Sequence, residues 1–351
     1  MKNLNVLLGL CLMILISSGI AFSTDYVSAG AGPADWNTAT TWSPNGVPTA
    51  TDNITIASGH AVTMVAAGAC ANFTMAAGSS LSINAATLPI PGTSWSLNPT
   101  STVTFNGPTT VQTGPVYGNL VYSTASSGSV STTAPTNLTI NGNFSITTAT
   151  FRGISATSGS VTHTVMGNVI VGPGTSARIS GVNQSASTTA SCTWDVRGNV
   201  SLTGDNAGNR LILFESAGPH SGTAQFIIGG NLTIGTVSLS ASQVQFRSSS
   251  GTIAYGTGII DLKGNLIKFG KIGVQASSTA GSFAFNMIGT SNQSWSESGS
   301  LDIASLTLNV NINNPAGITM NVPQTIGTNV VLNLINGNIT KTSNKNDSDI
   351  V

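Results

Sequence analysis

MGNVIVG (residues 166–172), RGNVSLT (197–203), GGNLTIG (229–235) and KGNLIKF (263–269) are four copies of one pattern, a Gly-Asn step followed by a short apolar strand. Two further copies precede them, YGNLVYS (117–123) and NGNFSIT (141–147). The glycines of the six copies are Gly118, Gly142, Gly167, Gly198, Gly230 and Gly264. Their spacing of about 24 to 34 residues falls within the period of about 20 to 50 residues that is typical of solenoids, propellers and arrays.

Apolar and polar residues alternate on both sides of each Gly-Asn step, as strands joined by a bend require. The glycine can supply a positive φ at that bend. The asparagines of four successive copies are Asn168, Asn199, Asn231 and Asn265. If the copies stack, these asparagines form a ladder whose side-chain amides hydrogen-bond along the stack.

These features predict an all-β protein, a right-handed parallel β-helix or β-solenoid with an N-terminal cap. One repeat cannot bury its own apolar face, but stacked repeats share a continuous core. The alternative fold is a chain of tandem β-sandwiches, which predicts Asn-Gly or Asp-Gly hairpin turns at short regular spacing. The repeated step here is Gly-Asn instead. Two longer segments, residues 101–123 and 282–309, resemble each other and flank the four coils.

The composition excludes one class of partner. Only 6% of the 351 residues are charged, and the 11 basic and 11 acidic residues cancel. Because such a chain releases few counterions from a polyanion, we expect no nucleic-acid partner. Apolar residues make up 40% of the chain, which favours a folded protein over a disordered one.

Residues 1–23 have the form of a signal peptide, with Lys2 before the apolar run LNVLLGLCLMILISSGIAF and small residues near the expected cleavage point. An uncleaved membrane anchor is the alternative, since the run is barely long enough to span a bilayer. We expect an exported protein, secreted or at the cell surface. The remaining predicted divisions are a cap with the first strands (24–64), the solenoid repeats (65–340) and a polar tail (341–351), at which the chain is either complete or truncated.

Two cysteines follow the signal segment, Cys70 and Cys192. An even number in an exported chain is compatible with a disulfide. In a continuous solenoid they are on the order of 20 Å apart, since roughly four to five coils of about 4.8 Å separate them. A disulfide needs Cα atoms within about 7 Å. We therefore expect two separate buried thiols.

The stretch DWNTATTWSPNGVPTATDNITIASGHAVTM (35–64) resembles a recurring N-terminal segment of secreted surface proteins from Bacteroidetes-type bacteria, related to the eight-glycine (G-eight) domain. The residues that carry the resemblance are Trp36, Trp42, Gly46, Pro48, Asp52, Ile54, Ile56, Gly59, Val62 and Cys70. The resemblance implies a surface or secreted β-solenoid, often adhesin-like or polysaccharide-associated, of the kind exported by the type IX route. The sorting domain that frequently ends such proteins is not visible in this sequence.

A solenoid end exposes unpaired backbone and an apolar cross-section, so it needs a cap. Trp36 and Trp42 are predicted to plug that end, with a platform for sugar stacking as the alternative role. Gly46 and Pro48 are expected to interrupt regular secondary structure and form the turn. Asp52 would accept hydrogen bonds from loop amides.

Trp95 and Trp295 are the candidates for a ligand-binding role, in which an exposed ring stacks on a sugar. Both lie in Ser-rich segments, GTSWSLNP and NQSWSES, that we expect to be loops. Ordinary packing of the two rings is the alternative.

The sequence predicts no catalytic residue, metal site or cofactor. Glycoside hydrolysis needs two carboxylates about 5 to 9.5 Å apart, and only two glutamates, Glu215 and Glu297, follow the signal segment. The densest ionisable cluster consists of Asp195, Arg197, Asp205, Arg210, Glu215 and His220. Outward charges of this kind usually form solvated pairs. His163 shares the inward register of Trp194 and is predicted to be a core residue.

We therefore expect a structural or adhesin-like surface solenoid whose polar faces meet glycans or neighbouring cell-surface components. It would meet a membrane only through the signal segment. Two alternatives stay open. One is a carbohydrate-active β-helix enzyme, a lyase or hydrolase, that uses the 195–220 cluster. The other is a passive stalk of a larger surface protein.

Overall fold

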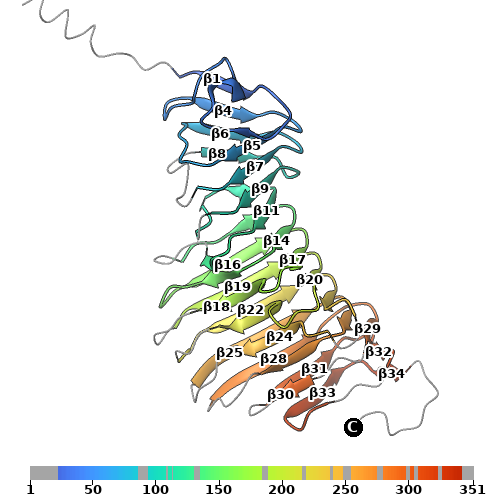
Figure 1. Cartoon of the computed structure of the whole chain (residues 1–351). Helices are drawn as coiled ribbons and strands as arrows, with labels where there is room; N and C mark the ends of the chain where they lie inside the picture. The colour runs from blue at the N-terminus through green and yellow to red at the C-terminus, as the bar shows by residue number, and fades with distance from the viewer. Residues whose placement is uncertain are drawn as a thin grey trace, which may run out of the picture.

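The computed structural model describes residues 23–85, 94–107, 110–112, 114–129, 135–183, 189–215, 219–237, 240–247, 254–274, 280–297, 301–303, 307–322 and 326–341. Across these residues the chain forms an all-β solenoid of stacked parallel strands, which confirms the predicted fold class (Figure 1). The strand pairs are parallel, apart from the antiparallel pair that β3 makes with β1 at the N-terminal end. Tandem sandwiches would be antiparallel throughout, so that alternative is wrong.

Four sheets make up the described structure. Sheet I has the order β3 (Trp42–Ser43), β1 (Asp25–Ser28), β4 (Asn53–Ile56), β6 (Asn72–Met75), β8 (Ser94–Leu97). Sheet II runs the length of the molecule as β2 (Ala34–Asp35), β5 (Ala61–Met64), β7 (Ser80–Ile83), β9 (Thr102–Phe105), β11 (Asn119–Tyr122), β14 (Phe144–Ile146), β17 (Val169–Val171), β20 (Val200–Leu202), β23 (Leu232–Ile234), β26 (Leu266–Lys268), β29 (Gln293–Ser296), β32 (Ile318–Met320), β34 (Ile339–Lys341).

Sheets III and IV belong to the later coils. Sheet III is β10 (Val116–Tyr117), β13 (Thr139–Ile140), β16 (Ser160–Val165), β19 (Ser191–Val196), β22 (Thr223–Ile228), β25 (Ala254–Leu262), β28 (Ala280–Met287), β31 (Leu308–Asn313), β33 (Val330–Asn336). Sheet IV is β12 (Gly128–Ser129), β15 (Thr150–Ile154), β18 (Arg178–Val182), β21 (Arg210–Phe214), β24 (Gln243–Arg247), β27 (Lys271–Val274), β30 (Leu301–Ile303). One short 3-10 helix, η1 (Ala39–Thr41), lies in the cap.

The coils widen from the N-terminal end to about Asn265 and then shorten, with 25 residues from Phe283 to Leu308 and 22 from Leu308 to Val330. In the first coils Asn53 pairs in register with Asn72, 19 residues later. In the widest coils Asn231 and Asn265 occupy equivalent corners and are 34 residues apart. The first coils hold one strand of sheet I and one of sheet II, whereas the longer coils hold strands of sheets II, III and IV. This is why the molecule is narrow at its N-terminal end and broad toward its C-terminal end in Figure 1.

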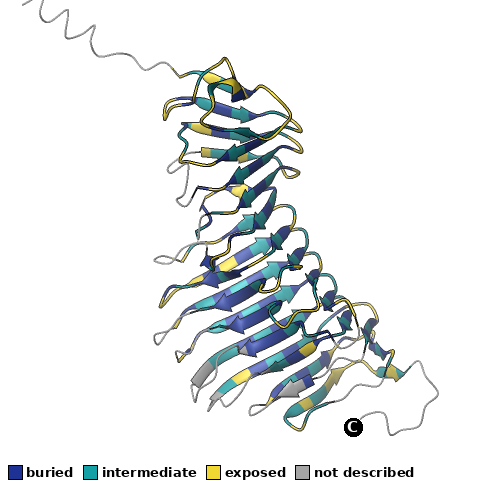
Figure 2. Cartoon of the chain, viewed as in Figure 1, coloured by how far each residue is buried: buried dark blue, intermediate teal, exposed yellow. Residues whose placement is uncertain are grey.

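Period-two alternation places the apolar residues inside. Within β4, β5 and β7 every second side chain is buried, and the same holds for β19 and β22. The buried side chains form one hydrophobic core from Trp36 to Met320. Figure 2 colours the buried residues dark blue, and they recur in the strands along the whole stack. The stack therefore has a single core, as a solenoid requires.

The glycines of the Gly-Asn steps serve a different purpose from the predicted one. None of the six has a positive φ, so that prediction is wrong. A Cβ on Gly198 would instead lie 2.5 Å from the carbonyl oxygen of Gly167 in the preceding coil, and a Cβ on Gly167 would lie equally close to that of Gly142. Glycine is needed here because successive coils touch through their backbones at this corner.

The asparagine ladder is present, but its bonds differ from the predicted amide-to-amide contacts. Each Oδ1 accepts a hydrogen bond from the backbone N–H of the next asparagine: Asn168 from Asn199 at 2.8 Å, Asn199 from Asn231 at 2.7 Å and Asn231 from Asn265 at 2.8 Å. The column also extends beyond the four predicted members, to Asn119 and Asn143 on one side and to the N–H of Ser294 on the other.

The predicted cap closes the N-terminal end. Trp36 and Trp42 are buried with their rings edge to face, 5.0 Å between centroids. Trp42 donates from Nε1 to the carbonyl oxygen of Trp36 at 2.7 Å. Pro48 is buried, and a Cβ on Gly46 would lie 2.6 Å from Oη of Tyr26, so both residues belong to a tightly packed turn.

Asp52 behaves as predicted. Its carboxylate accepts hydrogen bonds from the backbone N–H groups of Thr24 at 2.8 Å and Thr49 at 2.7 Å, and from the Thr49 hydroxyl at 2.7 Å. Burial raises the pKa of Asp52, but these hydrogen bonds outweigh it and the net pKa lies below the usual value. The side chain thus ties the start of β1 to the start of β4.

The two cysteines are buried and form no disulfide, which confirms the prediction of separate thiols. Burial raises the pKa of the Cys192 thiol. The predicted signal peptide lies outside the described residues except for its last residue, and so does the polar tail beyond Lys341. Among the described residues, no helix is long and apolar enough to cross a bilayer.

Candidate functional site

The two candidate tryptophans lie in strands, not in loops. Trp295 is 1% exposed and points inward from β29, so the prediction that it stacks on a ligand is wrong. Trp95 is half-buried in β8, and its ring packs against Phe73 at 4.9 Å and Tyr117 at 6.3 Å. The prediction of loops was wrong because the flanking serines are the outward residues of alternating strands.

The predicted ionisable cluster between Asp195 and His220 is not one site. Asp195 and Arg197 form their own ion pair of 2.7 Å beside sheet III. Asp205 accepts hydrogen bonds from the backbone and hydroxyl of Thr236, which lower its pKa. His220 is buried against the ring of Phe214, 5.2 Å between centroids. The residues are close in sequence but lie on different faces of the coil.

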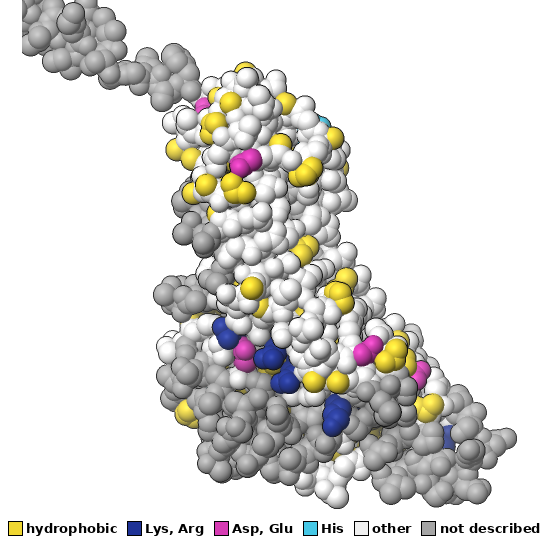
Figure 3. Space-filling view, viewed as in Figure 1, with side chains coloured by type: hydrophobic (Ala, Val, Ile, Leu, Met, Phe, Trp, Pro, Cys, Tyr) yellow, Lys and Arg dark blue, Asp and Glu magenta, His cyan; other side chains and the backbone are white. Residues whose placement is uncertain are grey.

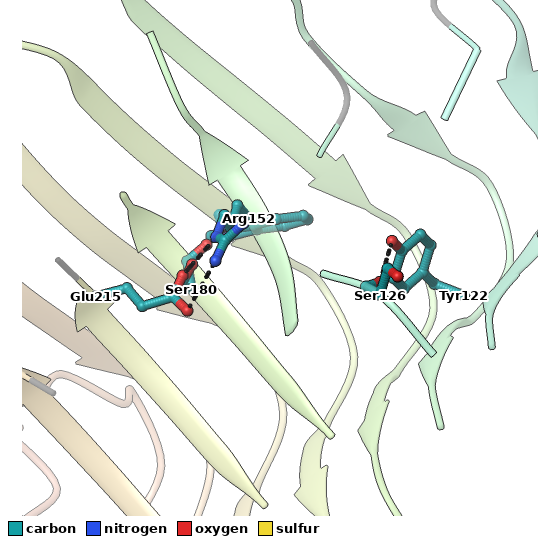
Figure 4. A network of polar contacts seen from close by, with 6 residues as sticks. Tyr122, Ser126, Arg152, Ser180 and Glu215 are labelled. Carbon is teal, nitrogen blue, oxygen red and sulfur yellow. Dashed lines mark hydrogen bonds and ion pairs between the residues drawn. The ribbon is translucent and has the colours of Figure 1, made fainter. Parts of the chain in front are cut away.

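Glu215 has a partner that the sequence did not reveal. Arg152 donates from Nε to Oε2 of Glu215 at 2.8 Å and from Nη2 to Oε1 at 3.3 Å, and the Ser180 hydroxyl donates to Oε2 at 3.2 Å (Figure 4). Arg152 lies on β15, Ser180 on β18 and Glu215 just after β21, so the contact spans two coils. Arg152 and Glu215 are 63 residues apart, and only the stacking of coils brings them together.

This arrangement offers little for acid–base chemistry. Both oxygens of Glu215 accept hydrogen bonds from Arg152, and this positive charge stabilises the carboxylate form, which makes Glu215 a weaker base. Nearby, burial raises the pKa of Tyr122, against a smaller lowering by the charge of Arg152, and its hydroxyl donates to the carbonyl oxygen of Ser126 at 2.9 Å (Figure 4). In the part of the chain that the structure describes, no three His, Cys, Asp or Glu side chains gather to hold a metal ion.

The outer face of sheet II forms what we call the hydroxyl face. Its column in register is Thr63, Ser82, Thr104, Val121, Ser145, Ile170, Ser201, Thr233, Ile267 and Ser296. These side chains are half-buried, seven of the ten carry a hydroxyl, and none is charged. The face is therefore a neutral strip along the stack, in which most residues carry a hydroxyl.

Sheet IV is different, because its strands begin with the cation column, which we define as Arg178, Arg210 and Lys271. Further along the same strands the outward residues Ser180, Ile212 and Gln245 are buried. Arg178 pairs in register with Arg210, Arg210 with Gln243 and Gln243 with Lys271. Lys and Arg side chains gather over the broad part of the molecule in Figure 3, whereas the narrow part shows none in this view. After Lys2, the first basic residue of the whole chain is Arg152.

Main-chain oxygens orient the two arginines of the column. Arg178 donates from Nε to the carbonyl oxygen of Gly208 at 3.2 Å, and Arg210 donates from Nε to that of Ala207 at 2.6 Å. Arg210 also donates from Nη1 to Oε1 of Gln245 at 3.2 Å. Burial lowers the pKa of Arg210, and the charge of Arg178 lowers it further.

Lys268 is a buried cation that the sequence analysis missed. It is 0% exposed and points into the core from β26, with Nζ 5.8 Å from the ring centroid of Trp295. Its Nζ has no hydrogen-bond partner among the described residues, and burial lowers its pKa to about 8. The alternation of KGNLIKF could have revealed it, since Lys268 shares the register of Leu266.

Comparisons with protein families, with curated proteins and with solved structures found no match to this chain. The resemblance of the N-terminal segment to bacterial surface solenoids therefore stays a prediction.

Proposed function

We propose that this protein is an exported, adhesin-like structural protein that binds glycans along the side of its β-solenoid. The observation that carries the proposal is the hydroxyl face, a neutral strip of Ser, Thr and β-branched residues in register over ten successive strands. The segment before residue 24, with the form of a signal peptide, supports export.

The chemistry of this face suits a neutral or weakly charged glycan. Each hydroxyl is both a donor and an acceptor, so it can match sugar hydroxyls in either sense. A single hydrogen bond exchanged with water contributes only about 1 kcal/mol. A long polymer that contacts many coils makes many such hydrogen bonds, and their small contributions add up. A rigid sheet also loses little conformational freedom on binding.

A passive stalk is the second candidate, and the elongated outline of the molecule supports it (Figure 1). A stalk needs length and stiffness but no ligand. The two functions differ in whether the lateral faces bind anything.

A polysaccharide pull-down separates these functions. The chain from residue 24 onward is incubated with neutral and acidic polysaccharides, and released sugars are assayed in parallel. A variant with Thr63, Thr104 and Thr233 changed to Val removes three hydroxyls at constant shape, and Thr193→Val on sheet III is the matched control. We expect binding without release, weakened by the triple change and not by the control. Absence of binding to every polymer would favour the stalk, and release of sugars would favour an enzyme.

A further inference from the structure

We propose that the starts of the sheet IV strands form a second binding surface, at which Arg178, Arg210 and Lys271 hold the carboxylates of an acidic polysaccharide. This inference rests on the proposed function and deepens it by naming a ligand class. It concerns a face of the solenoid other than the hydroxyl face.

The spacing of the cation column suits an extended polymer lying along the axis. Arg178 and Arg210 occupy neighbouring coils, and Lys271 lies two coils beyond Arg210. With about 4.8 Å between strands, the three cations span on the order of 15 Å. Gln243 lies between them, where its amide can bond sugar hydroxyls. An extended chain of sugar rings that advances about one coil per ring would present its carboxylates to successive members of the column.

The charge of the two arginines is not balanced within the described structure. The ion pairs of Arg152 with Glu215 and of Arg197 with Asp195 include neither Arg178 nor Arg210. Carbonyl and amide oxygens fix the arginine side chains without neutralising them. Like charges opposite each other on neighbouring strands destabilise a sheet. An anion bound across both guanidinium groups removes that cost.

The chemistry favours carboxylates carried on a glycan over nucleic acid. A guanidinium fork fits a carboxylate in two parallel hydrogen bonds. Nucleic acid needs a large basic excess to release counterions, whereas the charges of this chain cancel. Basic residues are nevertheless concentrated locally, since Arg152, Arg178, Arg210, Arg247 and Lys271 all lie on strands of sheet IV.

The test compares polygalacturonate with its fully methyl-esterified form, which has the same backbone without charge, and with single-stranded DNA. Binding of the chain from residue 24 onward is measured at several NaCl concentrations. We expect at least about tenfold tighter binding to the acid than to the ester, weakening as salt rises. Arg178→Gln combined with Arg210→Gln should abolish that preference while leaving binding to the ester unchanged.

Arg197→Gln combined with Lys263→Gln is the matched control, because it removes two basic residues beside sheet III, and we expect it to change binding by less than about twofold. Arg178→Lys with Arg210→Lys keeps the charge but loses the fork, and should give an intermediate loss. If the Gln variant does not fold, this Lys variant decides the question.

The failures are distinguishable. Equal binding of acid and ester, unaffected by either change at the column, overturns this inference and leaves the proposed function standing. Binding of no polysaccharide at all overturns both. Tighter binding of DNA than of polygalacturonate assigns the column to nucleic acid and overturns the choice of ligand.

Discussion

One hydrophobic core runs through the whole stack, but its cross-section differs between the narrow coils up to Phe105 and the broad coils after Val116. In the narrow coils the step from Asn53 to Asn72 is 19 residues, and two facing sheets fill the interior with apolar side chains. In the broad coils the step grows to 34 residues, as from Asn231 to Asn265, and a third sheet opens the cross-section.

Two of the ionisable side chains buried in the broad coils, His163 and Lys268, differ in their partners. His163 is satisfied: Nδ1 accepts from the N–H of Leu138 at 3.0 Å, Nε2 donates to the carbonyl oxygen of Gly153 at 2.8 Å, and the ring lies 4.4 Å from that of Trp194. Lys268, three coils later, has only the face of Trp295. The broad coils therefore enclose one polar group that is satisfied and one that is not.

The largest effect is expected at the capped narrow end. Trp42→Ala should cost about 3 to 5 kcal/mol, as for other large buried aromatic residues. Because solenoid coils contact only their neighbours, the loss should be local. Hydrogen exchange should show faster amide exchange in β1 and β4, with β19 and β22 little changed. Trp42→Phe, which keeps most of the packing but loses the bond to Trp36, should be milder. Uniform loss of protection along the whole chain would contradict an independent cap.

Replacing the unsatisfied cation should stabilise the broad coils. The pKa of Lys268 is lowered to about 8 in the folded chain, from 10.5. Above pH 10.5 the Lys268 amine is neutral in both the folded and the unfolded chain, so its burial costs no stability through ionisation. As the pH falls to 8 the unfolded chain binds the proton first, so stability is lost across that window. The full loss, roughly 3 kcal/mol, is present at pH 7.

Lys268→Met should therefore raise the unfolding free energy by roughly 3 kcal/mol at pH 7 and by much less at pH 11. Urea titrations at both pH values measure this difference. Lys263→Met is the control, because Lys263 is exposed and lies just before the Gly-Asn step of the same coil. This change should alter the unfolding free energy little at either pH. A destabilised Lys268→Met variant would mean that Nζ has a favourable partner.

The buried His163 should cause a second range of pH in which the free energy of unfolding changes. Burial lowers the pKa of His163 to about 4 from 6.5, although its bond to Gly153 opposes the shift. Above pH 6.5 both states are neutral, and below it the unfolded chain is protonated first. Stability should thus fall by roughly 3 kcal/mol between pH 6.5 and 4.

Unfolding free energies of wild type and His163→Gln across pH 4 to 7 measure this window. The variant should be less stable at pH 7, because the bonds to Leu138 and Gly153 are disturbed, but its slope below pH 6.5 should be flatter. An equal slope in both proteins would show that other groups cause the acid sensitivity.

The sequence predicted what depends on local pattern. Alternation and the Gly-Asn spacing were enough for the solenoid, for the ladder column and for the burial of His163 beside Trp194. The cap followed from the need to close an apolar end. One missed contact depended on how coils of unequal length stack. The pair of Arg152 with Glu215 joins residues two coils apart, and no regular period relates them.

Two other errors had a chemical origin. Serines around Trp295 suggested a loop, although hydroxyl residues suit the outward positions of a strand. Lys268 was overlooked because a lysine is expected to face solvent. In both cases the register of the neighbouring residues was a better guide than the residue type.

The smallest expected effect distinguishes the observed ladder from an amide-to-amide one. Asn199→Ala removes the acceptor for the N–H of Asn231, and since Asn199 is exposed and water can replace the oxygen, the cost should be about 1 kcal/mol. Asn199→Asp keeps an acceptor oxygen and should retain most of that stability. Because each bond ends on a backbone N–H, the loss should not spread, and Asn199→Ala with Asn143→Ala should be additive in urea unfolding. Coupling between these two changes would point instead to side chains that bond one another along the stack, as Asn72 and Asn53 do in the narrow coils.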